Sequence, residues 1–503
     1  MRASAQRTTA PRCWQWHTLV LLLLLLGCNS GGGGIATVPS AAWPRFRHDT
    51  GHTGQGPGDV ASARATPMAI PVDADAPRSP VLASPAIGIE GNVFVASQAG
   101  TLLSVGPNGE ARWRLTECAA CPAGDATFGP IVSSPTLYAV PNQVPTLFFG
   151  SESGRFYAVE DRREGPVCTM CFDPRRNGEA AAARFSAPAL VLIHSVTTRP
   201  VQIIAPAAMR ASEGGAEVGR VWSLSSTGEV LWRYPPTGTW PAPFVSSPAL
   251  AVANSVVVGS SDGFLHLLDA AQGGLLRWRL LVGPIVDPDT PVALVPVVTS
   301  SAFFMNTADG NVSAISPDGS GISWQRAFAD TRFAASLALG VQAPPTVTFT
   351  PTPPPASATP TPTPTEAALP TTPGTQATPT PSATATASAT PTPLSLNSVL
   401  FAISKDGRLL ALAARDGRDA PLGDVQQVVE GEVLSSPALS QDGYLVFGTT
   451  KGLLYAIDNT SGLAAWPPIS LTSAPVRSSP AIGFDGSIWV GADDGVLYRI
   501  GSQ

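Results

Sequence analysis

The chain has 503 residues, a net charge of −6 and an unusual balance of residue types. Its 51 Pro and 48 Gly each make up about 10% of the chain, against averages of roughly 5% and 7%, whereas charged residues reach only 13%. The negative charge argues against a nucleic-acid binder. The apolar runs are too short for a protein with several membrane-spanning helices.

The N-terminus is organised as an export signal. Basic Arg2, Arg7 and Arg12 precede an apolar run at 19–26, which is far shorter than the ~20 residues that a membrane-spanning helix needs. A short apolar run behind a basic segment is typical of a secretory signal peptide. The sequence therefore predicts that the protein is exported.

The end of this apolar run carries a second signal. Leu-Leu-Gly-Cys at 25–28 resembles the lipobox of bacterial lipoproteins. The resemblance implies that residues 1–27 are cleaved as a lipoprotein signal peptide and that the Cys28 sulfur carries a lipid. In such families Asn29 in place of Asp favours the outer membrane, if the cell has one. An ordinary signal peptide followed by a chance Cys28 is the alternative. The Gly-rich residues 28–42 are then a flexible leash.

Eight copies of one pattern follow, each a turn that ends in Gly and then five residues of alternating polarity. The pentamers begin at Thr101, Arg155, Arg220, Phe264, Asn311, Arg408, Leu453 and Val496. In most units a Ser-Pro-Ala step and a short strand precede the pentamer, and a turn of the Asp-Gly type joins that strand to it. A fourth strand is marked by Trp113, Trp232, Trp278, Trp324 and Trp466, which we interpret as packing residues rather than a binding platform.

This pattern predicts the fold class. Period-2 apolar alternation with frequent Gly turns indicates antiparallel sheet. A four-stranded unit of ~40–50 residues that is repeated radially is the blade of a β-propeller. We therefore predict an all-β chain in which residues 43–503 form an eight-bladed β-propeller of four-stranded antiparallel blades.

One low-complexity tract interrupts the repeats. Residues 344–393 contain 15 Pro and 17 Thr with Glu366 as the single charge, a composition that cannot form a hydrophobic core. Without the tract, the fifth and sixth pentamers are spaced like the others. We therefore predict a disordered insertion inside the sixth blade, between strands near 336–339 and 399–403, rather than a linker between domains.

The last unit ends at Ile500 and lacks a fourth strand that carries Trp. The segment around Trp43 is the nearest candidate to supply this strand from the N-terminal side. Closing the ring in this way removes an exposed sheet edge. We therefore predict that the strand around Trp43 completes the eighth blade.

The repeat resembles a known one. Residues 265–278 look like the pyrroloquinoline quinone (PQQ) repeat, in which a blade ends in Asp-x-x-x-Gly-x-x-x-Trp, and Asp458, Gly462 and Trp466 have that spacing. The opening at 43–54 also resembles the usual start of PQQ-repeat domains. The resemblance implies the propeller fold. It leaves function open, because the family includes quinoprotein dehydrogenases, envelope scaffold lipoproteins and many uncharacterised exported proteins.

Four cysteines form the strongest local signal for a site. Cys118 and Cys121 make one C-x-x-C pair, and Cys168 and Cys171 make another. Four thiolates in paired knuckles suit tetrahedral Zn²⁺, whereas export favours disulfides. The repeat alignment places both pairs near the outer rim of neighbouring blades. A structural zinc site and disulfides therefore both remain open. Neither pair is followed by the His that haem attachment needs.

Three other candidate motifs are better explained as structural features than as functional sites. Gly259–Gly263 matches the G-x-S-x-G nucleophile elbow, but that motif needs a strand-turn-helix, and here it is one more hairpin turn. His48 and His52 are four residues apart, yet Pro44 and the surrounding Gly oppose a helix, so we interpret them as solvated turn residues. Carboxylates at the repeated turns predict a polar rim on one face: Asp262, Asp309, Asp406, Asp493 and Asp494.

Two classes of function fit this picture. The first is an envelope-anchored, non-enzymatic scaffold lipoprotein, monomeric, that docks protein partners and binds no nucleic acid. It would be exported and lipid-anchored to a bacterial membrane, at the outer membrane or the cell surface if the cell has one. The alternative is a PQQ-dependent quinoprotein dehydrogenase, or a binder of a sugar or other small ligand in the central channel.

The family enzymes have features that this sequence does not match. The resemblance implies for them a Ca²⁺-bound PQQ, a catalytic Asp and, in alcohol-oxidising members, a disulfide between adjacent Cys. No two Cys are adjacent here, and no residue can be placed in the catalytic Asp role. We therefore expect no catalytic or cofactor-binding residues and no PQQ. Structural zinc at the four Cys is the single cofactor that the sequence leaves possible.

Overall fold

The computed structural model describes residues 35–36, 43–63, 66–75, 78–122, 124–140, 143–194, 201–210, 215–252, 254–287, 293–341, 395, 397–426 and 429–501. The predicted signal peptide, Cys28 and the Pro/Thr tract lie outside these residues. Within them, no helix has the length and apolarity needed to cross a membrane.

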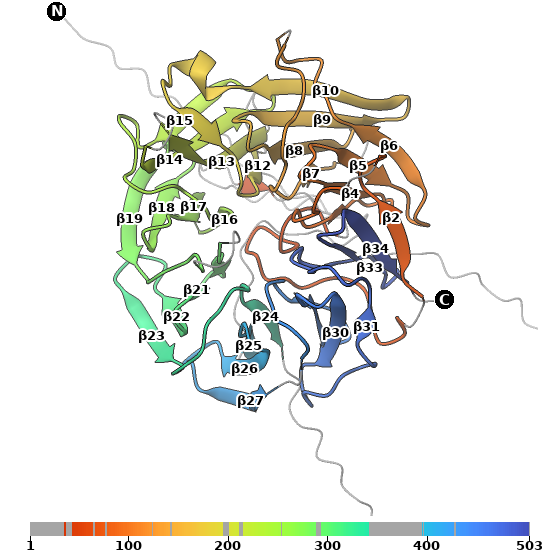
Figure 1. The fold of residues 1–503 in the computed structure, drawn as a ribbon. Helices are drawn as coiled ribbons and strands as arrows, with labels where there is room; N and C mark the ends of the chain where they lie inside the picture. The colour runs from red at the N-terminus through yellow and green to blue at the C-terminus, as the bar shows by residue number, and fades with distance from the viewer. Residues whose placement is uncertain are drawn as a thin grey trace, which may run out of the picture. The chain divides into compact units, whose positions relative to one another are not determined.

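The described strands form eight antiparallel sheets around a central axis, each with a short strand near the axis and the last strand at the periphery (Figure 1). Blade 1 contains β3 (Ala86–Ile87), β4 (Val93–Ala96), β5 (Leu102–Val105) and β6 (Ala111–Leu115). Blade 2 contains β7 (Thr136–Tyr138), β8 (Thr146–Gly150), β9 (Phe156–Arg162) and β10 (Gly165–Phe172). Blade 4 contains β16 (Ala249–Leu250), β17 (Ser255–Gly259), β18 (Phe264–Asp269) and β19 (Leu275–Leu281).

Blades 5 to 7 repeat this order. Blade 5 contains β20 (Val297–Val298), β21 (Phe303–Asn306), β22 (Asn311–Ile315) and β23 (Ile322–Ala327). Blade 6 contains β24 (Ala338–Val341), β25 (Ser398–Ile403), β26 (Arg408–Ala413) and β27 (Asp419–Gln426). Blade 7 contains β28 (Ala438–Leu439), β29 (Tyr444–Gly448), β30 (Leu453–Asp458) and β31 (Ile469–Ser470). The prediction of an eight-bladed β-propeller is confirmed.

Blade 3 is the largest. It contains β12 (Leu190–His194), β13 (Val201–Arg210), β14 (Glu217–Ser225) and β15 (Val230–Tyr234), with β1 (Ile35–Ala36) beside β12 and β11 (Ala182–Arg184) beside β13. A 3₁₀ turn at Pro174–Asn177 precedes β11. The added strand β1 brings the N-terminal chain to the innermost edge of this blade.

The middle strands carry the core. The third strands of the blades are buried along nearly their whole length, as in β5 and β30, whereas the outer strand β19 alternates between exposed and half-buried residues. The middle strands are covered on both faces by the neighbouring blades, so apolar residues suit both of their faces. The outer strands border solvent, so only one of their faces is packed.

The ring closes at blade 8, but not with the predicted strand. Blade 8 contains β32 (Ala481–Ile482), β33 (Ile488–Gly491), β34 (Val496–Ile500) and, as its fourth strand, β2 (Met68–Pro71). The prediction of a strand around Trp43 is therefore wrong in position. Trp43 instead pairs with Ile87 on the inner strand of blade 1 and is 2% exposed. The N-terminal chain first contacts the inner strand of blade 1 at Trp43. It then reaches the outer edge of blade 8 at β2.

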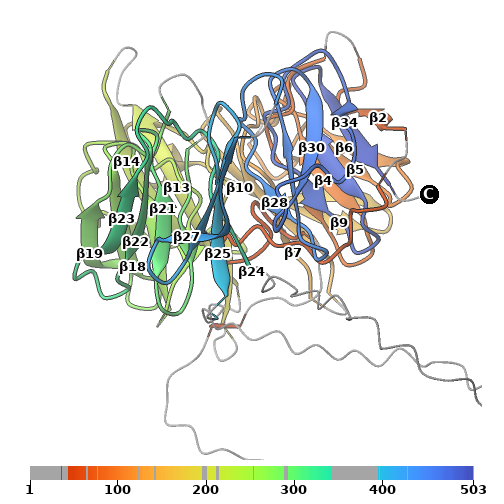
Figure 2. The same cartoon turned by 90° about the horizontal axis from the view of Figure 1, so that it is seen from below.

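The insertion within blade 6 is where the repeat spacing predicts it. β24 pairs with β25 from Ala338 opposite Phe401 to Val341 opposite Ser398, so residues 342–397 connect two adjacent strands of one sheet. The end of β24 lies on the lower face of the ring in Figure 2. The short turns between second and third strands lie at the opposite ends of the strands.

The Trp series joins neighbouring blades. The indole N–H of an outer-strand Trp donates to a backbone carbonyl of the next blade: Trp232 to Ala270 at 3.1 Å, Trp278 to Pro317 at 3.0 Å and Trp324 to Ala414 at 3.2 Å. Each ring also covers a Gly of that blade. A Cβ on Gly274, Gly319 or Gly417 would lie 2.3–2.5 Å from the ring atoms, and all three have a positive φ. The Trp residues are thus structural contacts, as predicted.

Candidate binding site at the propeller axis

Residues 43–56, here called the axial segment, line the inner wall of the ring. Their backbone forms hydrogen bonds of 2.7–3.0 Å with the inner strands or strand ends of six blades: Trp43 with Ile87, Pro44 with Leu137, Thr50 with Leu250, Gly51 with Val298, Thr53 with Leu339, and Gly54 and Gly56 with Leu439. The inner strand of a blade has an edge without a neighbouring strand. The axial segment satisfies the free backbone groups at this edge.

The axial segment also buries charge. Arg45, Arg47 and His52 are buried, and Asp49 accepts hydrogen bonds from the backbone N–H groups of Gly51 and Thr53 at 2.9 and 3.0 Å. The prediction of a solvated turn residue is wrong for His52, which is 1% exposed with its Nε2 3.3 Å from Ser247 Oγ. Burial, opposed by the charge of Asp49, lowers the pKa of His52 to about 3, so this ring is neutral at neutral pH.

A ring of serines lies on the other side of the axial segment, where the chain enters the inner strands. The backbone N–H of one blade donates to the hydroxyl of the next over 2.8–3.1 Å: Val295 to Ser336, Ser336 to Ser436, Ser436 to Ser479, Ser479 to Ser84, and Ser84 to Ser134. These are Ser residues of the predicted Ser-Pro-Ala steps and their equivalents. The step therefore joins one blade to the next, which the sequence pattern alone did not indicate.

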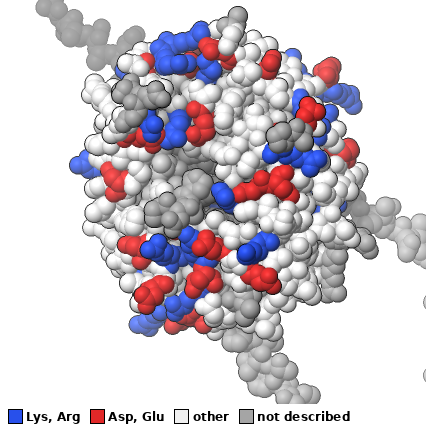
Figure 3. Space-filling model, in the orientation of Figure 1, with Lys and Arg blue, Asp and Glu red and all other residues white. Residues whose placement is uncertain are grey.

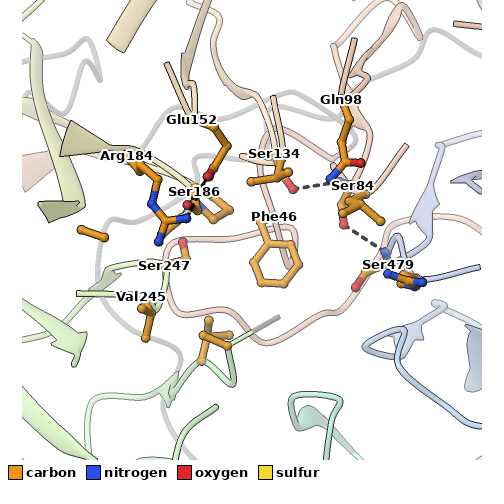
Figure 4. Close-up of a pocket in the computed structure, with 18 of the residues that line it drawn as sticks. Phe46, Ser84, Gln98, Ser134, Glu152, Arg184, Ser186, Val245, Ser247 and Ser479 are labelled. Carbon is orange, nitrogen blue, oxygen red and sulfur yellow. Dashed lines mark hydrogen bonds and ion pairs between the residues drawn. The ribbon is translucent and has the colours of Figure 1, made fainter. Parts of the chain in front are cut away.

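Above the serines lies a cavity of about 500 Å³. Phe46 of the axial segment points into its centre, and Ser84, Ser134 and Ser247 line its wall (Figure 4). Phe46 is the residue of the axial segment that lines the cavity. Its volume is in the range of small-ligand sites.

The charges of the cavity wall are paired. Arg184 contacts Glu152 at 3.3 Å and also Glu217, and Arg477 contacts Asp493 at 3.0 Å. Burial raises the pKa of Asp493, opposed by Arg477. Figure 3 shows this face, with acidic and basic side chains side by side over its middle. Asp493 belongs to the predicted polar rim of turn carboxylates, and Asp309 and Asp406 line a second, shallower hollow on blades 5 and 6.

The titratable side chains of the cavity lining are carboxylates and arginines. Among the described residues that line it, none is His, Cys or Lys. The G-x-S-x-G motif forms the turn between β17 and β18. Ser260 Oγ lies 3.1 Å from His266 Nε2, and Tyr234 Oη lies 3.1 Å from His266 Nδ1, but Ser260 and His266 are both 0% exposed. This hydrogen-bonded group is a buried polar core of blade 4, closed to a substrate.

The four cysteines lie together at the outer edge of blades 1 and 2, as the repeat alignment predicts. The structure joins Cys118 to Cys168 and Cys121 to Cys171 as disulfides, with Cα–Cα distances of 5.1 and 5.2 Å. Cys168 and Cys171 belong to β10, and the other two follow β6. This arrangement favours the disulfide alternative over structural zinc. Both bonds connect the same two blades at nearly the same place.

Comparisons with known proteins agree with this architecture. The family model described as outer membrane protein assembly factor BamB matches residues 210–349. BamB from Moraxella catarrhalis is similar in structure, with a TM-score of 0.51, 14% identity and coverage of 86% of this chain and 99% of that one. The chain is thus a β-propeller in which residues 210–349 resemble this family.

Other solved structures have a similar fold. Quinohemoprotein alcohol dehydrogenase from Comamonas testosteroni has a TM-score of 0.57 and 12% identity, with coverage of 92% of this chain and 81% of that one. The computationally designed Ika8 protein has a TM-score of 0.50 and 12% identity, with coverage of 86% and 98%. At these identities the likeness shows the fold alone. A sequence search among curated proteins finds no match.

The lining of the cavity offers few ligands for a Ca²⁺-bound PQQ. A Ca²⁺ ion needs several oxygen ligands. Within the described residues there is no group of three His, Cys, Asp or Glu placed to hold a metal ion. The two arginines of the lining, Arg184 and Arg477, are paired with carboxylates.

Proposed function

We propose that this protein is a non-enzymatic docking scaffold of the bacterial envelope, which binds a partner protein on the face that carries the cavity. The observation behind this proposal is the cavity at the axis, which has Phe46 of the axial segment at its centre and paired charges at its rim. Apolar centres with polar rims are the usual anatomy of docking surfaces. The likeness to an assembly factor supports the same class of function.

The course of the N-terminal chain supports the choice of face. β1 pairs with the last two residues of β12, Ile193 and His194, at the end of the inner strand that lies away from the cavity. A lipid on Cys28 would be seven residues before Ile35, a span of at most about 25 Å. Such an anchor would hold the opposite face toward the membrane and leave the cavity face open to a partner.

Site-specific photo-crosslinking tests this proposal. A photoreactive residue is placed at Gln98 or Ala293 in the cavity wall, and, as the matched control, at Leu275 on the outer strand of blade 4, which is 61% exposed. The full chain is expressed in a bacterial envelope. We expect a discrete protein adduct from the two cavity positions and none from Leu275. An absence of adducts, or equal adducts from all three positions, would contradict a docking face at the cavity.

The cavity volume favours a second candidate, a small ligand such as a sugar. Thermal unfolding with a panel of sugars, and separately with PQQ and Ca²⁺, tests it. A saturable rise of Tm with a sugar would establish the small-ligand function. Saturable binding of PQQ with dye-linked alcohol oxidation would replace the scaffold proposal. We expect neither.

A further inference from the structure

Two arginines of the axial segment are buried without full partners. Arg45 is 4% exposed, and its Nε and Nη1 have no hydrogen-bond acceptor among the described residues. Arg47 is 2% exposed, and its Nη1 donates to the carbonyl of Pro437 at 2.6 Å, but its Nε and Nη2 have no acceptor there. A buried guanidinium normally has its N–H groups paired. Four buried guanidinium nitrogens of Arg45 and Arg47 therefore have no hydrogen-bond acceptor among the described residues.

The local charge is also unbalanced. Asp49 is the carboxylate that acts on both guanidiniums, and it is engaged by the backbone and side chain of Thr53. Burial, opposed by Asp49, lowers the pKa of Arg45 to about 10 and that of Arg47 to about 9. His52 is neutral, as described above. Two positive charges therefore face one negative charge in a region shielded from water, which is costly without a further anion.

The backbone holds these groups in an unusual conformation. Arg47, His48 and His52 have φ values of 61°, 70° and 58°, in the left-handed region that non-Gly residues seldom adopt. Such residues cost about 1–3 kcal/mol each and persist where the surroundings fix them. Here the hydrogen bonds of the axial segment to the inner strands fix them. The segment thus adopts an unfavourable backbone conformation in which Arg45 and Arg47 are buried.

We propose that Arg45 and Arg47 bind a small inorganic oxyanion of the phosphate or sulfate class on the propeller axis, beneath the cavity. The planar fork of a guanidinium matches the spacing of two oxygens of such an anion. The open Nε and Nη atoms of both side chains supply the donors, and the anion balances the charge that Asp49 leaves uncompensated. Phe46, which lies between the two arginines in the sequence, lines the cavity, whereas neither arginine does. The site is independent of the partner-docking role.

A crystallographic experiment tests the site directly. Crystals of the mature chain are soaked in sodium selenate, whose selenium gives an anomalous signal. We expect an anomalous peak within hydrogen-bond distance of Arg45 or Arg47. Ordered water alone at these nitrogens, with no anomalous peak, would overturn the proposal. This measurement uses the wild-type protein and does not depend on the folding of a variant.

Thermal unfolding provides the second arm. Tm is measured between 1 and 20 mM sulfate at constant ionic strength for the wild type, for Arg45→Met and for the control Arg155→Met. Arg155 is also buried, but its side chain is paired with Asp125 at 2.7 Å and Asp173 at 3.6 Å. We expect sulfate to raise Tm by several degrees in the wild type and in R155M and by much less in R45M. Equal shifts in all three proteins would contradict a site at Arg45.

Discussion

The inner wall and the outer rim of this propeller join the same blades by different means. At the rim, a Trp of one blade covers a Gly of the next, so each contact is made by residues of consecutive repeats. At the inner wall, serine hydroxyls and the axial segment make the contacts, and the bond from Arg47 to Pro437 joins residues 390 positions apart. The rim is therefore a property of the repeat. The inner wall depends on one segment that belongs to no repeat.

Removal of the axial segment should have the largest effect. We expect that replacing residues 43–56 by a Gly-Ser segment of equal length costs at least about 5 kcal/mol, because loss of the buried Trp43 alone costs about 3–5 kcal/mol. Urea unfolding followed by tryptophan fluorescence measures this. The same replacement at residues 29–34, in the predicted leash, is the control and should change little. Equal stability of the two variants would mean that the blades close the ring without the axial segment.

The disulfides offer a test at the rim. Each closes a sequence separation of 50 residues, for which the chain-entropy model gives about 4 kcal/mol. Because both join the same two segments, the second closes almost no additional loop. We expect a variant with Ser at 118 and 168 to retain most of the stability, and a variant with Ser at all four positions to lose about 4 kcal/mol. Losses that simply add would contradict this redundancy.

Mass spectrometry of the exported chain decides the chemistry of the same four residues. We expect a mass lower by four hydrogens than that of the reduced chain and no bound metal. One Zn²⁺ with four free thiols would instead establish the tetrathiolate site that the two C-x-x-C pairs also suit. In that case chelation rather than reduction would weaken the contact between blades 1 and 2.

A Trp of the rim should matter less than the axial segment. Trp278 is half-buried against blade 5, and we expect Trp278→Ala to cost about 3 kcal/mol by losing its ring contact and its bond to Pro317. Blade 6 has no such Trp, and Leu422 and Val425 lie over Gly462 of blade 7 instead, 3.2 and 3.5 Å from a Cβ placed there. Val425→Ala is therefore the matched control, with an expected cost of about 1 kcal/mol. Similar losses measured by thermal unfolding would mean that the rim Trp is dispensable.

This contrast explains what the sequence could predict. The rim contacts were predictable because the Trp of the fourth strand recurs. Trp278 and Trp324 occupy equivalent positions in successive units, so the same packing role applies to each. Trp43 occurs once, and its partner Ile87 is set by how the ring closes. Its aromatic character indicated a strand residue, but nothing local distinguished the inner edge of blade 1 from the outer edge of blade 8.

The residues of the candidate sites also differ in how well the sequence predicted them. The two Cys pairs were placed correctly on neighbouring blades, because their position follows from the repeat alignment. The burial of Arg45, Arg47 and His52 was not predicted, because Gly and charged residues together are typical of exposed turns. A usable signal was the dense Gly spacing at 51, 54, 56 and 58, which permits the close approach of this segment to the inner strands.

The buried His266 predicts a pH dependence. Burial lowers its pKa to about 4, with Asp262 opposing and Arg279 adding to the effect. The unfolded chain binds a proton near pH 6.5 and the folded chain does not, so stability is full above pH 6.5 and falls as pH decreases toward 4. We expect His266 to account for a loss of about 2 kcal/mol between pH 6.5 and 5, so the wild type should lose about that much more than His266→Gln, whereas the buried His52 weakens both proteins alike. Identical pH profiles of unfolding would contradict a neutral buried His266.

The smallest effect should come from the Pro/Thr tract, although it is the longest non-repeat segment. Its composition predicts no core of its own, and β24 and β25 already have their register fixed between Val341 and Ser398. Replacing residues 344–393 by a six-residue Gly-Ser turn shortens the connection between β24 and β25 about fivefold, which by loop-closure entropy stabilises the folded chain by less than about 2 kcal/mol. Urea unfolding measures this against the wild type. A loss of stability would show that the tract contacts the propeller. A small gain of stability would show that the tract does not stabilise the propeller.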